Sequence, residues 1–182
     1  MNLSELNTII AVDPGKAGGI AVYNGETKVV KMPKELNDLR EFLHYYKENY
    51  NPIAFIEKLS VRPDDVSVQG GQPNFGKMYR IQRMLADYEK LKLIFEDEGI
   101  PFCLIAPMSW QSKLKVRNQI KEEKAVRKRR YAEIAQKWCP EVKATLWNAD
   151  ALLILACGKY LIENEPNWID SNLPKKIQQT LF

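Results

Sequence analysis

Three acidic residues stand where a carboxylate is unusual. Asp13 follows the β-branched apolar run 8–12, Glu57 follows a second apolar run, and Asp150 lies in an otherwise apolar segment. Clustered carboxylates repel one another unless a cation lies between them. Because oxygen ligands without His or Cys favour Mg²⁺ or Mn²⁺ over zinc, convergence of the three acids would predict a Mg²⁺ site. Two such ions can activate water on one side of a phosphodiester and stabilise the leaving oxygen on the other.

Each acid also has an ordinary structural explanation. Asp13 could be a turn residue, since a Pro-Gly pair follows it. Glu57 could pair with Lys16 or Lys58, and Asp150 could stabilise the first turn of a helix through the helix dipole. Taken singly, each acid fits both interpretations about equally well. Their joint placement after two apolar runs and on one apolar helix favours a site.

Other common chemistries find little support. His44 is the only histidine, which argues against zinc sites and a Ser-His-Asp triad. The three cysteines are widely spaced and form no CxxC pair, so neither a disulfide framework nor a thiolate zinc site is indicated. No stretch approaches the roughly 18 apolar residues of a membrane-spanning helix. We therefore expect a protein of the cell interior, cytoplasmic or inside a host cell, with no membrane contact and no small-molecule substrate.

Positive charge is concentrated in one segment. Residues 113–130 hold nine basic and two acidic residues, a local balance of +7 in a chain whose net charge is +4. The basic residues are Lys113, Lys115, Arg117, Lys121, Lys124, Arg127, Lys128, Arg129 and Arg130. A solvated helix face explains such a run about as well as a binding surface does. As a binding surface, it would suit an anionic partner, nucleic acid above all.

The acids need a scaffold, and the apolar periodicity of the chain predicts one. The expected strands are 8–12, 18–23, 28–31, 53–56 and 101–106. The expected helices are 35–50, 75–98, 121–138 and 147–162. A three-strand meander followed by crossover connections predicts an α/β fold with a mixed five-stranded sheet and helices on both faces. This layout is similar to the ribonuclease H-like fold.

The length of 182 residues suits one domain, with 45% apolar and 27% charged residues as in folded proteins. We expect the domain to span 1–162 and a C-terminal tail, 163–182, to pack on it or to be flexible. Residues 58–74 have the composition of a long functional loop. Asn74 is placed to cap the helix that follows, and Gly99 to close it.

Several motifs, in order, resemble the RuvC-type Holliday-junction resolvases, particularly their small phage and viral branch. They are IAVDPGKAGGIA at 10–21, FIEK at 55–58, NFG at 74–76, IAP at 105–107 with Trp110 after it, and ADALL at 149–153. The resemblance covers about residues 8–160. It implies a dimeric, Mg²⁺-dependent endonuclease, with Mn²⁺ able to substitute and two ions at the site, that nicks two opposing strands of a four-way DNA junction.

The resemblance also assigns roles to single residues. Asp13, Glu57 and Asp150 match the metal-binding acids of the family. Lys121 or Lys124 matches a basic residue near the scissile phosphate, and spacing alone does not choose between them. The residues expected to contact DNA are Lys16, Phe75, Lys113, Lys115, Arg117, Lys121, Lys124, Arg127 and Lys128.

The helix that begins at Phe75 carries two further expectations. Phe75 corresponds to the region that contacts the junction centre, where an aromatic ring could wedge against an unstacked base pair, although packing in the core is the more ordinary role. Met78, Tyr79 and Met84 form a stripe that is either a dimer contact, part of the core, or a mixture of both.

One departure from the family pattern bears on activity. Members carry a further carboxylate shortly before the ADAL segment, whereas residues 145–148 supply none. Asn148 could offer a neutral oxygen to the metal, Glu141 or Asp87 could move in, the enzyme could need more metal, or catalysis could be lost.

Three other functions therefore stay open. They are a non-catalytic junction-binding protein, a nuclease for RNA–DNA hybrids or other branched substrates, and an actin-like phosphate binder. The small size of the chain and the lack of a second phosphate loop argue against the last.

Overall fold

The alternating apolar runs fold into one sheet flanked by helices in the computed structural model, which describes residues 5–61, 74–117 and 122–174. The strands are β1 (Thr8–Val12), β2 (Gly19–Tyr23), β3 (Thr27–Lys31), β4 (Pro52–Glu57) and β5 (Phe102–Ile105). The helices are α1 (Leu36–Asn49), α3 (Phe75–Asp97), α4 (Pro107–Lys113), α5 (Lys124–Trp138), α6 (Ala149–Asn164) and α7 (Pro166–Asn172).

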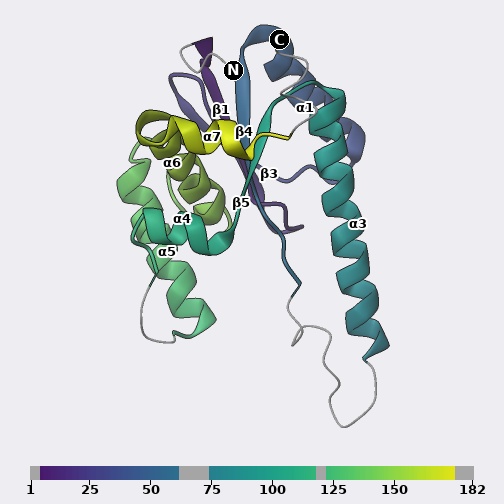
Figure 1. The fold of residues 1–182 in the computed structure, drawn as a ribbon. Coiled ribbons are helices and arrows are strands. Elements are labelled where there is room, and N and C mark those ends of the chain that lie inside the picture. Colours follow the sequence, from purple (N-terminus) through teal and green to yellow (C-terminus); the bar gives the residue numbers. More distant parts are fainter. Residues whose placement is uncertain (1–4, 62–73, 118–121, 175–182) are drawn as a thin grey trace.

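The five strands form a mixed sheet in the order β3-β2-β1-β4-β5. The first three strands form an antiparallel meander, whereas β4 and β5 join it in parallel with β1. Figure 1 shows α4, α5, α6 and α7 on one face of the sheet and α1 and α3 on the other. The predicted mixed five-stranded sheet with helices on both faces is therefore confirmed.

Two cores lie on the two faces, and strand alternation sorts the residues between them. Ile9, Ala11 and Phe55 pack in the first core, toward α6, together with residues of α5 and α7. Ile10 and Val12 pack in the second core, toward α1 and α3. The central strands are buried on both faces, as parallel strands with helices on either side require.

The boundaries of α3 follow the predicted signals. The Asn74 side chain accepts a hydrogen bond from the backbone N–H of Lys77 at 2.9 Å, and Gly99 has the left-handed φ of 62° that ends many helices. The expected functional loop falls largely in residues 62–73, outside the described residues.

Two short helices were not predicted. Helix α4 lies between the expected strand 101–106 and the expected helix 121–138, and α7 lies in the segment expected to be a tail. Ile169 and Leu173 of the α7 region are buried in the first core. No helix in the described part of the chain is both long and apolar enough to cross a membrane.

Candidate functional site

The sheet register places two of the predicted acids side by side. Val12 pairs with Ile56 in the parallel β1–β4 ladder, so Asp13 and Glu57 are the next residues on neighbouring strands. By alternation they share the face of Ala11 and Phe55, which is the face that α6 covers. Asp13 and Glu57 thus lie at the carboxyl ends of adjacent strands, beneath one helix.

The loop after β1 wraps closely around Asp13. A Cβ atom on Gly18 would lie 2.2 Å from the Asp13 carbonyl oxygen and 2.8 Å from its carboxyl carbon, so this position has no room for a larger residue. The backbone N–H of Gly15 hydrogen-bonds the Asp13 carboxylate. The Pro-Gly turn is therefore part of the acid's environment as well as a chain reversal.

Helix α6 brings the third acid to the same place. Its apolar sequence buries ten residues, and Asp150 lies in its first turn. The helix approaches the sheet closely at Gly158, where an added Cβ would lie 2.5 Å from the Phe55 ring. This close approach lets the first turn of α6 reach the ends of β1 and β4.

Trp110 binds Glu57 from α4. The indole is 1% exposed, and its Nε1–H donates to Glu57 Oε1 at 2.9 Å. The ring also packs edge-on against Tyr131 of α5, with 5.6 Å between ring centroids. Trp110 thus orients one carboxylate and joins two helices beside the site.

Lys128 of α5 binds the third acid. Its ammonium group donates to Asp150 Oδ2 in an ion pair whose side chains are 32% and 15% exposed. The other Asp150 oxygen is buried and has no hydrogen-bond partner among the described residues. The carboxylate therefore keeps one oxygen available for a further ligand.

Burial and mutual repulsion shift the titration of two acids toward neutral pH. Burial raises the pKa of Asp13 from 3.8 to about 6, repulsion from Asp150 adds to the rise, and Lys128 and the Gly15 N–H oppose it. Burial raises the pKa of Glu57 from 4.5 to about 7; the Trp110 hydrogen bond lowers it, the charges of Asp13 and Asp150 raise it, and Lys128 lowers it. The three acids are thus one electrostatic cluster.

The donor chemistry of this cluster suits a hard divalent cation. It offers carboxylate oxygens, one of them buried and unpartnered, and two carboxyls whose raised pKa values a cation would lower. Within residues 5–61, 74–117 and 122–174, however, no group of three acidic, His or Cys residues has a geometry that could hold a metal ion. Among these described residues, Lys128 is the only one that forms an ion pair with any of the three acids.

Asn148 makes two hydrogen bonds in the turn before α6. Its side-chain oxygen accepts from the Thr145 N–H at 2.7 Å, and its amide donates to the Lys143 carbonyl at 3.2 Å. Both ends of this buried amide therefore hold the turn that leads into α6. Because an amide oxygen has two lone pairs, the metal ligand expected at Asn148 stays a prediction.

Other replacements for the missing carboxylate are also engaged elsewhere. The residue one helical turn before Asp150 is Trp147, whose ring lies against Gly19 at the start of β2. Glu141 accepts a hydrogen bond from the Thr27 hydroxyl, which lowers its pKa. Asp87 lies on α3, across the sheet from α6, where it lines a pocket. The cluster consequently consists of three acids.

The predicted basic residues divide into paired and free ones. Lys113 forms an ion pair with Glu165 at 2.6 Å, so it ties α4 to the segment before α7 instead of presenting a free charge to DNA. The basic residues expected to contact DNA that are exposed are Lys16, Lys115, Arg117, Lys124 and Arg127. The structure thus retains an exposed basic surface on α5 and the segment before it.

Helical spacing decides which lysine approaches the acids. Lys124, Lys128, Tyr131 and Ala135 share one face of α5, and the last two are buried in the first core. Lys128 reaches Asp150, whereas Lys124, one turn earlier, is exposed; Lys121 lies outside the described residues. Sequence reasoning missed this contact, because the spacing from Tyr131 shows only that Lys128 lies on the core-facing side of α5 and does not show its partner.

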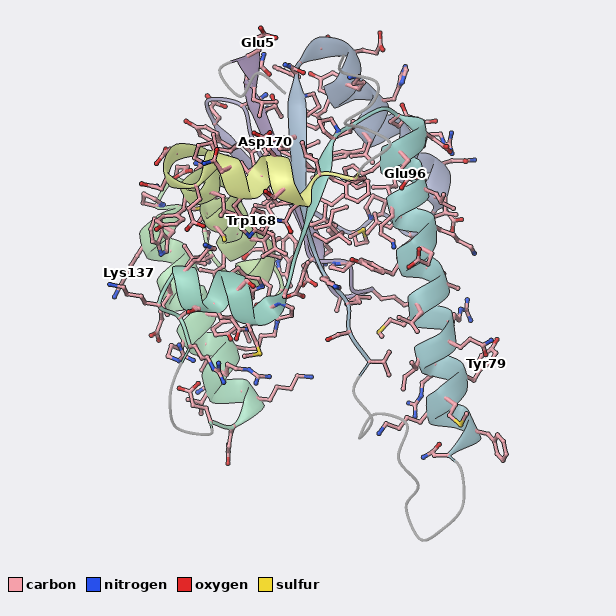
Figure 2. All side chains as sticks on the ribbon, in the orientation of Figure 1. Glu5, Tyr79, Glu96, Lys137, Trp168 and Asp170 are labelled. Atoms are coloured by element: carbon pink, nitrogen blue, oxygen red, sulfur yellow. The ribbon has the colours of Figure 1, made fainter. Side chains whose placement is uncertain are left out.

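Phe75 and the stripe on α3 are exposed. The side chain of Phe75 is 73% exposed, so the expectation that it packs in the core is wrong. Met78, Tyr79 and Met84 are exposed as well. Figure 2 shows Tyr79 on the side of α3 that points away from the sheet. Helix α3 contributes to the core only in its second half, through Tyr88 and the apolar residues after it.

Among the comparisons with known proteins, the one with solved structures gives the fold. No protein-family model matches the sequence, and no curated protein matches it. A structure of T. thermophilus RuvC in complex with a Holliday junction substrate matches with a TM-score of 0.54 at 15% identity, covering 87% of this chain and 96% of that one. A Thermus thermophilus RuvC structure matches with a TM-score of 0.48 at 13% identity, covering 86% and 95%. The chain therefore has the ribonuclease H-like fold of RuvC.

Proposed function

We propose that this chain, which has the fold of RuvC, is a metal-dependent endonuclease of the RuvC type that resolves four-way DNA junctions by paired nicks. The observation that carries the proposal is the cluster of Asp13, Glu57 and Asp150 at the carboxyl ends of β1 and β4. The protein compared above is bound to a Holliday junction substrate, which makes branched DNA the first substrate to test. The site of action would be the cell interior, or that of a host cell.

The acid cluster would hold Mg²⁺, or Mn²⁺ in its place. Asp13, Glu57 and the free oxygen of Asp150 would be its ligands. When bound, the divalent ions supply an activated water and stabilise the departing oxygen of a phosphodiester. With three acids and no carboxylate at Trp147, a second ion would bind more weakly than the first.

The residues around the acids would prepare them for this role. Trp110 fixes the orientation of Glu57 through its N–H, and burial beneath α6 keeps the site in a medium of low dielectric. Lys128 neutralises part of the cluster's charge and lies where it could instead contact a phosphate oxygen. The resemblance assigned the same role to Lys121 or Lys124, and that assignment stays a prediction.

DNA would lie along the exposed basic residues of α5 and the segment before it. Phosphate contacts from Lys115, Arg117, Lys124 and Arg127 are independent of sequence, as recognition of a branched shape requires. A homodimer about a two-fold axis would match the symmetry of a four-way junction. The exposed apolar stripe of Phe75, Met78 and Tyr79 on α3 would supply its contact surface.

A non-catalytic junction-binding protein is the second candidate. It is favoured by the Lys128–Asp150 ion pair and by the lack, among the described residues, of a ready geometry for a metal. Under this alternative Lys128 is a permanent counter-ion that stabilises the fold in place of a metal.

An assay with end-labelled DNA separates the two functions. A four-way junction and a linear duplex of the same sequence are incubated with Mg²⁺, with Mn²⁺ or with EDTA, using the wild-type chain and Asp13→Asn. We expect nicks in the junction alone, in either metal, and none with Asp13→Asn. Tight junction binding without cleavage in any metal would support the second candidate instead.

A further inference from the structure

A pocket of about 530 Å³ lies on the opposite side of the Asp13 loop from the acids. Its walls are the loop 14–16, the segment 32–36 that leads into α1, and one side of α3. Two of its lining residues, Leu39 and Leu91, are buried and belong to the second core. The pocket is thus separate from the acid cluster, which faces α6, and belongs to the face that α1 and α3 cover.

The charges around this pocket suit an anion. Four basic side chains line it, from three separate elements: Lys16, Lys34, Arg83 and Lys90. None of them forms a salt bridge with any residue that the structure describes. Two acids, Glu35 and Asp87, also line it, so the cations outnumber the acids by two.

The size and the apolar part of the pocket narrow the ligand further. A volume of this order accommodates a ligand of small-molecule size, and it is too small for duplex DNA. Proline, methionine and leucine side chains contribute the rest of the lining, which gives a sugar or a base an apolar surface. Arginine can bind a phosphate through two parallel hydrogen bonds. A single nucleotide combines these features.

One residue connects the pocket to the acid cluster. Gly15 lines the pocket, and its backbone N–H hydrogen-bonds the Asp13 carboxylate. A nucleotide in the pocket would therefore lie on one side of this loop while the acids lie on the other. This is the arrangement expected if one DNA strand passes around the end of β1.

From this geometry we propose that the pocket binds one unpaired nucleotide of the DNA strand whose neighbouring phosphate lies at the acid cluster. The inference rests on the proposed function for the identity of the strand. It adds Lys34, Arg83 and Lys90 to the DNA contacts and places them on the face of the sheet opposite α5.

The test compares two charge-matched double variants in DNA binding. Arg83→Ala/Lys90→Ala removes two pocket cations from exposed helical positions, where alanine is well tolerated. Lys28→Ala/Lys143→Ala removes two exposed cations that line neither the pocket nor the proposed DNA surface of α5. Fluorescence anisotropy with a labelled four-way junction, in EDTA, gives the affinity as a function of salt without any cleavage.

We expect the pocket variant to lower the slope of log affinity against log salt by about 0.7 to 1.4, because each phosphate contact to an unpaired strand contributes about 0.7. The control variant should keep the wild-type slope. Equal slopes for the two variants would overturn the proposal, as would a wild-type protein that binds no DNA. As a control for folding, the Tm of both variants should equal that of the wild type.

A second titration identifies the source of the nucleotide. Free deoxynucleoside monophosphate should compete with DNA only weakly. One combined result would show that the pocket serves a free nucleotide and that the DNA proposal is wrong. In that result the monophosphate binds the wild-type chain but not the pocket variant, while the two double variants show equal salt slopes for DNA binding. Because these measurements need no cleavage, a protein that binds in this way but does not cut would contradict the nuclease function and leave the pocket assignment intact.

Discussion

Asp13→Asn should stabilise the fold in the absence of divalent cations. Burial and the charge of Asp150 raise the pKa of Asp13 from 3.8 to about 6, so folding at pH 8 forces an ionised carboxylate into a place that disfavours it. At about 1.4 kcal/mol per pKa unit, this costs the wild-type fold about 3 kcal/mol at pH 8. Asparagine keeps the shape and can still accept the Gly15 N–H. Removing the charge also relieves repulsion on Glu57, which acts in the same direction.

The sign of the pH dependence follows from the raised pKa. Below pH 3.8 the Asp13 carboxyl is protonated in both the folded and the unfolded chain, and its contribution to the stability of the fold is fully present. That stability is lost as the pH rises through 6, the pKa of the carboxyl in the folded chain. The advantage of Asp13→Asn should therefore fall from about 3 kcal/mol at pH 8 to about 0.6 kcal/mol at pH 4. In a chain of this size 3 kcal/mol corresponds to a shift of about 6–12 °C in Tm.

Thermal unfolding in EDTA at pH 8 and pH 4 measures both quantities. Asp38→Asn serves as control, because Asp38 is an exposed acid in the first turn of α1, and its loss should lower stability by at most about 1 kcal/mol. If Asp13→Asn were no more stable than the wild type at pH 8, or if its advantage were the same at both pH values, Asp13 would be an ordinary turn residue. Mg²⁺ should raise the Tm of the wild type and leave that of Asp13→Asn unchanged.

Three further substitutions test the surroundings of the acids. Lys128→Met removes the cation that lowers the pKa of both Asp13 and Glu57, so it should cost about 1–3 kcal/mol at pH 8 in EDTA; Arg129→Met, at an exposed position, should cost less than half as much in the same unfolding experiment. Trp110→Phe removes the hydrogen bond that lowers the pKa of Glu57, so an NMR titration of the Glu57 carboxyl should give a pKa above 7. An unchanged pKa would show that the indole N–H does not influence the ionisation of Glu57. Gly158→Ala places a methyl group 2.5 Å from the Phe55 ring and should lower the free energy of unfolding by about 1–3 kcal/mol. Gly76→Ala is the control and should not lower it, because the nearest neighbour of its added methyl group is 3.7 Å away. Equal Tm values for the two variants would contradict the close approach of α6 to the sheet.

The parts of the fold that follow from periodicity were predictable. The strands ending before Asp13 and at Glu57 are continuous apolar runs, and their burial on both faces follows from that pattern. The caps of α3 were predictable for a similar reason, since Asn74 and Gly99 act within a few residues of their own positions. Helix α4 was missed because its seven residues are too short to show a period.

The contacts between elements were not predictable from sequence in the same way. Trp110 reaches Glu57 across 53 positions in the sequence, and Lys128 reaches Asp150 across 22, so no local pattern carries either contact. Asn148 looked like a ligand because of its amide, and the hydrogen bonds of that amide to two backbone groups of the turn before α6 were not predicted. Phe75 looked like a core residue because of its type, but the first half of α3 extends beyond the sheet, as Figure 1 shows.

The measurement that tests the central claim most directly is cleavage of a supercoiled plasmid that extrudes a cruciform from an inverted repeat. Two nicks on opposing strands within one binding event give linear DNA, whereas single nicks give open circles. The account predicts linear product that depends on Mg²⁺ or Mn²⁺, that maps to the base of the cruciform, and that disappears with Asp13→Asn. Linear product from Asp13→Asn at the wild-type rate, or none from the wild type in either metal, would contradict it.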